Sequence, residues 1–75
     1  MAMLNINTDV MEFMVWVIEL VAHEFFDGDK VRAYKMLNEH GLWAFFIQSY
    51  DITHSLGANI IVGEVREVLT AKGVI

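Results

Sequence analysis

The stretch VMEFMVWVIELVAHEFF, residues 10–26, decides the fold class because it is apolar around most of a helix. At 100° per residue, one narrow stripe holds three of the polar side chains and one tryptophan: Glu12, Trp16, Glu19 and His23. An ordinary surface helix shows the reverse, a limited apolar stripe on a polar body. We therefore expect a helix over residues 8–26 that is either central to the fold or buried on two faces. In the second case one face packs in its own domain and the other against another chain.

The same stretch is not expected to cross a membrane, because ionisable residues interrupt it and a spanning helix needs about 20 apolar residues. No basic segment precedes it and no small-residue cleavage site follows, so it does not read as a signal peptide. We expect a cytoplasmic protein. Trp16 is either a surface anchor for a partner or a ring partly covered by a neighbouring helix.

Composition points to self-association. The chain has 75 residues, enough for one small domain, and no cysteine, so no disulfide can stabilise it. With 56% hydrophobic residues it holds more apolar side chains than so small an interior can bury, and a subunit interface is the natural place for the excess. We expect residues 1–7 to be a loose lead-in, residues 8–75 a single helical domain, and the protein a homodimer or larger homo-oligomer.

The charge balance argues against nucleic-acid binding. The formal net charge is −5, and the five cations include only one cluster, Lys30, Arg32 and Lys35. Binding to a phosphate backbone depends on a basic surface that releases counterions. No nucleic-acid partner is therefore expected.

Four helices are predicted in all, over residues 8–26, 29–40, 42–53 and 56–72, as a compact all-α bundle with no sheet. The helix signals are local ones. Asn7 is a cap for the first helix, with Ile6 and Met11 placed as a hydrophobic staple. The turn at residues 27–29 offers caps for the second helix, whose Val31, Tyr34 and Leu37 are predicted to face inward. Gly41 and Gly73 end helices in the left-handed conformation.

The last two predicted helices carry the aromatic centre and an amphipathic face. Together with Trp16, the exposed-interface candidates are Trp43, Phe45 and Phe46. The final helix places one apolar face on the core, formed by Ile61, Val62, Val65, Val68 and Leu69. Gly63 interrupts that helix at a cost of about 1 kcal/mol relative to alanine, for which the sequence offers no reason.

The box YDITHS, residues 50–55, is the most polar stretch of an apolar chain. If the third helix continues through it, Tyr50 and His54 lie one turn apart on the apolar face and Asp51 lies opposite. Ser55 is placed to cap the last helix by accepting from the N–H of residue 57 or 58. Asp51 is placed to accept from the His54 ring or from the turn backbone. This favours a structural junction, with a functional site of Tyr50, Asp51, His54 and Ser55 as the alternative.

Other chemical motifs are weak. His23 to Asp27, HEFFD, resembles the zinc-protease pattern HExxH, but an aspartate replaces the second histidine, and a polar helix end is the better interpretation. No serine lies in a Gly-x-Ser-x-Gly elbow and no glycine-rich loop precedes a helix. We assign no catalytic residue, no metal ligand and no cofactor.

With these residues in view, the chain resembles a family of short uncharacterised bacterial proteins, a domain of unknown function, family thirty-seven ninety-one. The resemblance covers about residues 8–74 and rests on AYKMLNEHG, residues 33–41, on the box with its Tyr-Asp-x-x-His-Ser/Thr pattern, and on a closing amphipathic helix that ends at Gly73. The family has no established activity. Some members are encoded beside proteins that resemble ADP-ribosyltransferase-type toxins, which implies a partner-binding or antitoxin-like role. The apolar GLWAFFIQS, residues 41–49, departs from the family pattern and favours a buried interface.

Two functions remain open from the sequence. The first is a protein-interaction module that self-associates and can bind a partner protein. The second is a metal- or small-ligand-binding protein, or an enzyme, that uses Tyr50, Asp51 and His54. In that case His23 or His40 of a second subunit would complete the site.

Overall fold

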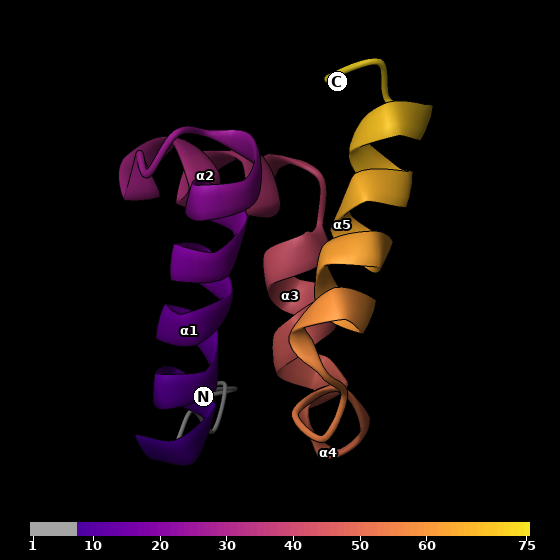
Figure 1. Ribbon diagram of the computed structural model, residues 1–75. Helices are drawn as coiled ribbons and strands as arrows, with labels where there is room; N and C mark the ends of the chain where they lie inside the picture. Colours follow the sequence, from indigo (N-terminus) through magenta and orange to yellow (C-terminus); the bar gives the residue numbers. More distant parts are fainter. Residues whose placement is uncertain (1–7) are drawn as a thin grey trace, which may run out of the picture.

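The computed structural model describes residues 8–75, and every regular element in that range is a helix (Figure 1). The helices are α1 (Thr8–Phe25), α2 (Lys30–Glu39), α3 (Leu42–Gln48), α4 (Tyr50–Thr53) and α5 (Ala58–Ala71). The Cα radius of gyration is 12.0 Å, close to the value of roughly 11 Å for a compact chain of this length. The predicted all-α bundle without a sheet is confirmed for residues 8–75. The lead-in at residues 1–7, with the Asn7 cap and the Ile6 staple, lies outside the described residues.

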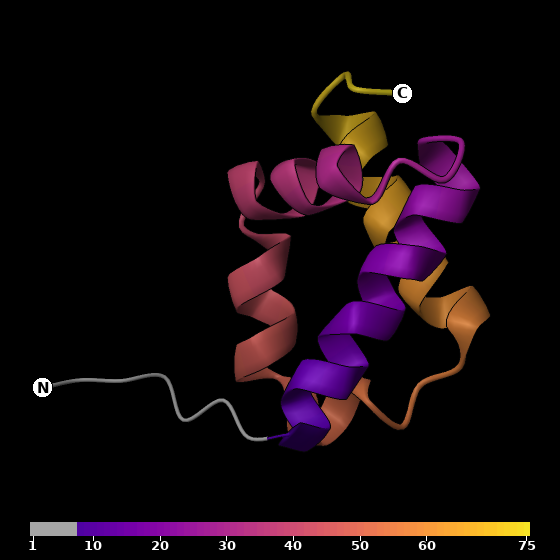
Figure 2. The same cartoon turned by 90° about the vertical axis from the view of Figure 1, so that its left-hand side faces the viewer.

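The core is built on one face of α1. Helices α1, α3 and α5 run alongside one another, and α2 crosses one end of the bundle (Figures 1 and 2). The largest fully enclosed side chains come from all four longer helices: Met14, Val17, Val21, Leu37, Phe46, Ile61, Val65 and Leu69. The predicted inward face of the last helix is confirmed, with Val68 half-buried and the other four residues buried.

Local capping signals place the turns where the sequence predicts them. The Asp29 side chain accepts a hydrogen bond from the Arg32 backbone N–H at 3.1 Å and caps α2. Gly41 joins α2 to α3 with φ 73°, the left-handed conformation that glycine adopts without strain. Gly73 ends α5 in the same way, and the Val74 N–H behind it donates to the Leu69 carbonyl at 2.8 Å.

The predicted third helix is wrong in one respect, because it breaks at Ser49 into α3 and α4. The Ser49 hydroxyl and the Ser49 N–H both donate to the Phe45 carbonyl, and the residue adopts φ −102° and ψ 20°. The Ser49 carbonyl then accepts from the N–H groups of Ile52 and Thr53 and starts a new turn. A serine hydroxyl that competes for backbone partners gives the chain this alternative to a continuous helix.

The predicted cap at Ser55 is also wrong. Helix α5 begins at Ala58 with Gly57 at the cap position, and no side chain caps it. Ser55 lies two residues before that position, and its hydroxyl instead donates to the Ile52 carbonyl at 2.9 Å. Ser55 therefore closes the end of α4 and does not start α5.

The predicted inward face of α2 is only partly correct. Leu37 is fully buried, but Val31 is 67% exposed and Tyr34 is 40% exposed. Val31 and Leu37 lie about 120° apart around a helix, so they do not share one contact face. Ala33 and Leu37, one turn apart, form the buried pair instead.

Gly63 is expected to lower the free energy of unfolding relative to alanine, because no close packing at this position requires a glycine. A Cβ built at Gly63 has no atom within 4 Å to meet, and the backbone there is helical. Gly63→Ala should therefore stabilise the fold by about 1 kcal/mol and raise the melting temperature by about 4–8 °C in thermal unfolding followed by circular dichroism.

Gly73→Ala is the matched control for this prediction. A Cβ at Gly73 also meets nothing within 4 Å, but its φ of 74° is unfavourable for alanine. This variant should melt at a lower temperature than the parent. Shifts of the same sign for both variants would contradict the account.

Candidate functional site

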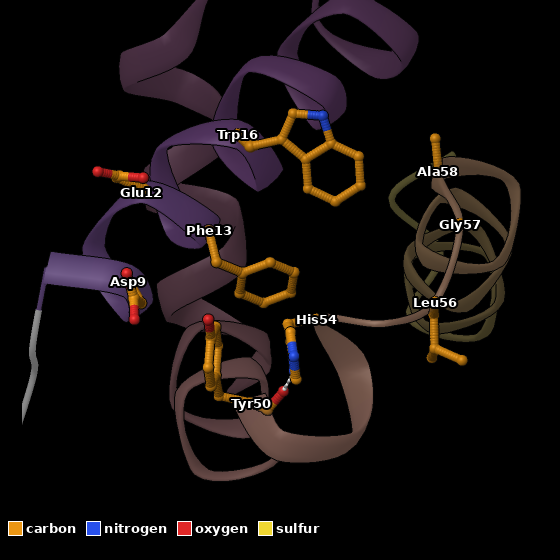
Figure 3. Close-up of a pocket in the computed structure, with 9 residues that line it drawn as sticks. All are labelled: Asp9, Glu12, Phe13, Trp16, Tyr50, His54, Leu56, Gly57 and Ala58. Atoms are coloured by element: carbon orange, nitrogen blue, oxygen red, sulfur yellow. Dashed lines mark hydrogen bonds between the residues drawn. The ribbon is translucent and has the colours of Figure 1, made fainter.

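Two hollows on the described surface bring predicted residues together. One is a cleft between α1, α4 and the start of α5, which we name the box cleft. It is open to solvent and has a volume of about 440 Å³. Its walls are Asp9, Glu12, Phe13, Trp16, Tyr50, His54, Leu56, Gly57 and Ala58 (Figure 3). Two residues of the YDITHS box, Tyr50 and His54, therefore face a cleft.

Aromatic rings make up one wall of the box cleft. The Tyr50 ring meets the edge of Phe13 at a centroid distance of 5.5 Å and an interplanar angle of 75°. The His54 ring stacks on Tyr50 at 4.4 Å and 15°, and its Nδ1 hydrogen-bonds to the Tyr50 carbonyl. Because a carbonyl oxygen only accepts, Nδ1 is the donor in this bond. Tyr50 and His54 thus form one stacked pair, and its Tyr50 ring packs on α1.

The other two candidate residues of the box lie outside this cleft. Asp51 is exposed and does not line the cleft, and the hydrogen bond predicted between Asp51 and the His54 ring does not form within residues 8–75. Ser55 is exposed and bonded to Ile52. The box therefore contributes two neighbouring rings to a surface, and its Asp51 and Ser55 do not join them.

Sequence reasoning missed Thr53, the buried polar residue of the box. Thr53 is 4% exposed, and its hydroxyl donates to the Ser49 carbonyl at 2.9 Å. The helical spacing from Ser49 to Thr53 was the available signal, because a threonine hydroxyl bonds to the carbonyl four residues earlier. Thr53 and Ser49 hold the junction between α3 and α4.

The four interface candidates do not form one surface. Phe46 is fully buried in the core and so is not part of an exposed interface. Trp16 lines the box cleft, and the exposed Phe45 packs edge-on against Phe46. Trp43 is half-buried and meets the Tyr34 ring edge-on at 4.9 Å.

The second hollow is a groove between α1 and α2, which we name the α1–α2 groove. It encloses about 370 Å³ and is lined by Val15, Ile18, Glu19, Lys30, Val31 and Tyr34. Its walls are mainly hydrocarbon, with one carboxylate and one ammonium group among the lining residues. The Tyr34–Trp43 contact extends this apolar surface toward α3.

No cluster of metal ligands is present in the part of the chain that the structure describes. That part holds no group of three or more His, Cys, Asp or Glu residues able to bind a metal ion. In the HEFFD segment, Asp27 follows the end of α1 in a left-handed turn with φ 54°. Nor does any helix within residues 8–75 have the length and apolar character needed to cross a membrane.

Comparison with known proteins identifies a family and no characterised relative. A family model described as "Protein of unknown function (DUF3791)" matches residues 12–72. No curated protein and no solved structure matches the chain. The family resemblance predicted from the sequence is confirmed, while the match leaves the role of the Tyr-Asp-x-x-His box untested.

The contribution of Tyr50 to stability should come from its ring. The ring packs on Phe13 and His54, while the hydroxyl makes no hydrogen bond within residues 8–75. Tyr50→Ala should lower the free energy of unfolding by about 1–3 kcal/mol, and Tyr50→Phe by less than about 0.5 kcal/mol. Urea unfolding followed by circular dichroism at one fixed protein concentration measures both. Equal losses for the two variants would show that the hydroxyl carries the interaction.

Proposed function

The chain belongs to the DUF3791 family, and we propose that it is a small helical protein-interaction module that self-associates through the α1–α2 groove. The observation that carries this proposal is the exposed apolar surface on two neighbouring helices. Val15 is 50% exposed and Val31 is 67% exposed, beside the half-exposed Tyr34. Exposed apolar residues that cluster around a hollow are typical of an interaction site, whereas singly scattered ones are not.

The surface of the molecule is large enough for such an interface. The chain exposes 5074 Å², and a standard interface removes roughly 800 Å² from each partner, about a sixth of this surface. The α1–α2 groove spans two helices and supplies the apolar centre that such an interface needs. The exposed Met11 lies one helical turn before Val15, and Trp43 packs on Tyr34. Aromatic side chains such as Tyr34 and Trp43 are typical central contacts of interfaces.

Charge complementarity favours a second copy as the occupant. Glu19 and Lys30 both line the groove. In a two-fold symmetric dimer each residue pair occurs twice, so Glu19 of one copy can face Lys30 of the other in both directions. The groove is nearly neutral in a chain of net charge −5, so two copies approach there with little repulsion.

A different protein is the second candidate occupant of the same groove. The resemblance to the family implies a partner-binding or antitoxin-like role, and an apolar groove between two helices suits an amphipathic segment of a partner. A chain that stays monomeric at micromolar concentration would favour this candidate. A dimer whose stability depends on the groove favours self-association.

Val31→Glu should weaken the dimer. The change buries a charge at the apolar interface, and it leaves the folded monomer intact because Val31 is exposed in the first turn of α2, where glutamate is favourable. The parent should sediment at twice the 8.6 kDa chain mass at micromolar concentration, and the variant should dissociate with a dissociation constant at least about tenfold higher.

Ile52→Glu is the matched control, because Ile52 is equally exposed at 69% but lies on α4, outside the groove. It adds the same charge to the chain and should leave the dissociation constant unchanged. A parent that sediments as a stable monomer would overturn self-association. Equal effects of the two variants would move the interface away from the groove.

The pairing of Glu19 with Lys30 across the interface is testable by charge reversal. Glu19→Lys and Lys30→Glu should each weaken the dimer, because each places like charges opposite one another. The double variant should recover most of the loss. Sedimentation of the four proteins at low and high salt gives the coupling, and additive losses in the double variant would exclude the pair.

A further inference from the structure

The box cleft gathers aromatic and acidic side chains from one face of α1. Asp9, Glu12, Phe13 and Trp16 follow the helical spacing i, i+3, i+4 and i+7 and line the same side of the cleft. The Phe13 and Trp16 rings lie 6.0 Å apart at 36°. Phe13 is buried beneath the cleft, while Trp16 is exposed at its edge. This helix face thus offers ring surface with carboxylates beside it.

Helix α4 extends the aromatic wall. The stacked Tyr50 and His54 rings continue from Phe13 toward the start of α5 (Figure 3). His54 is fixed by its bond to the Tyr50 carbonyl, so the wall is largely formed before any ligand arrives. A preformed wall lowers the ordering cost of binding.

The two ends of the box cleft differ in charge. Asp9 and Glu12 lie on the far side of Phe13 from Gly57 and Ala58, where α5 begins (Figure 3). The uncapped start of α5 carries partial positive charge, so a cation is disfavoured at that end. Asp9 and Glu12, together with the neighbouring Phe13 and Tyr50 rings, attract a cation at the opposite end.

We propose that the box cleft binds an organic cation, a guanidinium or alkylammonium group with an apolar stem. The charged group lies at the Asp9 and Glu12 end, where the two carboxylates supply the countercharge, and the apolar stem runs across Phe13 toward the Trp16 ring, which lies on the α5 side (Figure 3). A volume of about 440 Å³ falls within the range of roughly 300–1,000 Å³ for small-ligand pockets and accommodates an arginine-sized group. An anion is repelled by the two carboxylates and by the net charge of −5. The proposal does not depend on self-association, because Val31 and Tyr34 of the α1–α2 groove lie outside this cleft.

The cation can reach the cleft as a free small molecule or as an arginine or lysine side chain of another protein. Four probes separate charge from shape and source. N-acetyl-arginine amide carries the guanidinium, N-acetyl-citrulline amide is its neutral counterpart, and n-butylguanidinium is a simple alkylguanidinium without a peptide backbone. An acetylated Gly-Arg-Gly amide that binds more tightly than n-butylguanidinium indicates a protein source, and the reverse order indicates a free small molecule.

The experiment is a titration of the ¹⁵N-labelled full chain, followed through the Trp16 indole N–H and the backbone amides of residues 54–58. N-acetyl-arginine amide should shift these signals saturably at millimolar concentration, and N-acetyl-citrulline amide should not. Absence of shifts with every cationic probe, or equal shifts with the citrulline compound, would overturn the proposal.

Two pairs of variants locate the cation. Trp16→Leu should weaken binding of N-acetyl-arginine amide by about three- to tenfold, and Glu12→Gln by about twofold. The controls are Phe45→Leu and Glu67→Gln, which remove an exposed ring and an exposed carboxylate outside the cleft and should leave binding unchanged. Equal losses in a variant and its control would refute the assignment.

Discussion

The packing of the inner face of α1 against α2, α3 and α5 is the interaction on which the rest of the structure depends. Val17 and Val21 on this face are completely enclosed. Since α1 is apolar on most of its circumference, two further faces remain after the core is filled. Val15 borders the α1–α2 groove, and Trp16 borders the box cleft. The apolar composition of α1 thus accounts for the core and for the apolar residues of both hollows.

Features set by neighbouring residues were predictable from the sequence. The extent of α1, the Asp29 cap and the left-handed glycines depend on local backbone hydrogen bonds and conformational limits. The break at Ser49 was not predictable in this way, because a hydroxyl there competes with an otherwise favourable helix. Nor does local sequence decide that Phe46 is buried and Phe45 exposed, since that depends on where α1 and α5 lie.

The YDITHS box combines two kinds of residue. The Thr53 hydroxyl donates to the Ser49 carbonyl where α3 meets α4, and the Ser55 hydroxyl donates to the Ile52 carbonyl at the end of α4, as a structural junction requires. Tyr50 and His54 pack on α1 and form the wall of a cleft. The sequence supplied the right residue types and predicted that Asp51 lies away from the ring pair, but the cleft that Tyr50 and His54 line depends on the position of α1. Thr53 and Ser55 therefore hold the local backbone, while Tyr50 and His54 of the same short segment form the cleft wall.

We propose that the exposed apolar face of α1 and α2 packs against the same face of a second copy. Isotope-filtered NOE spectroscopy tests this contact most directly. The sample mixes ¹³C-labelled and unlabelled chains. Intermolecular NOEs that involve Val15, Val31 and Tyr34 are expected, and none that involve Ile52. Absence of intermolecular NOEs at millimolar concentration, or NOEs centred on another face, would contradict it.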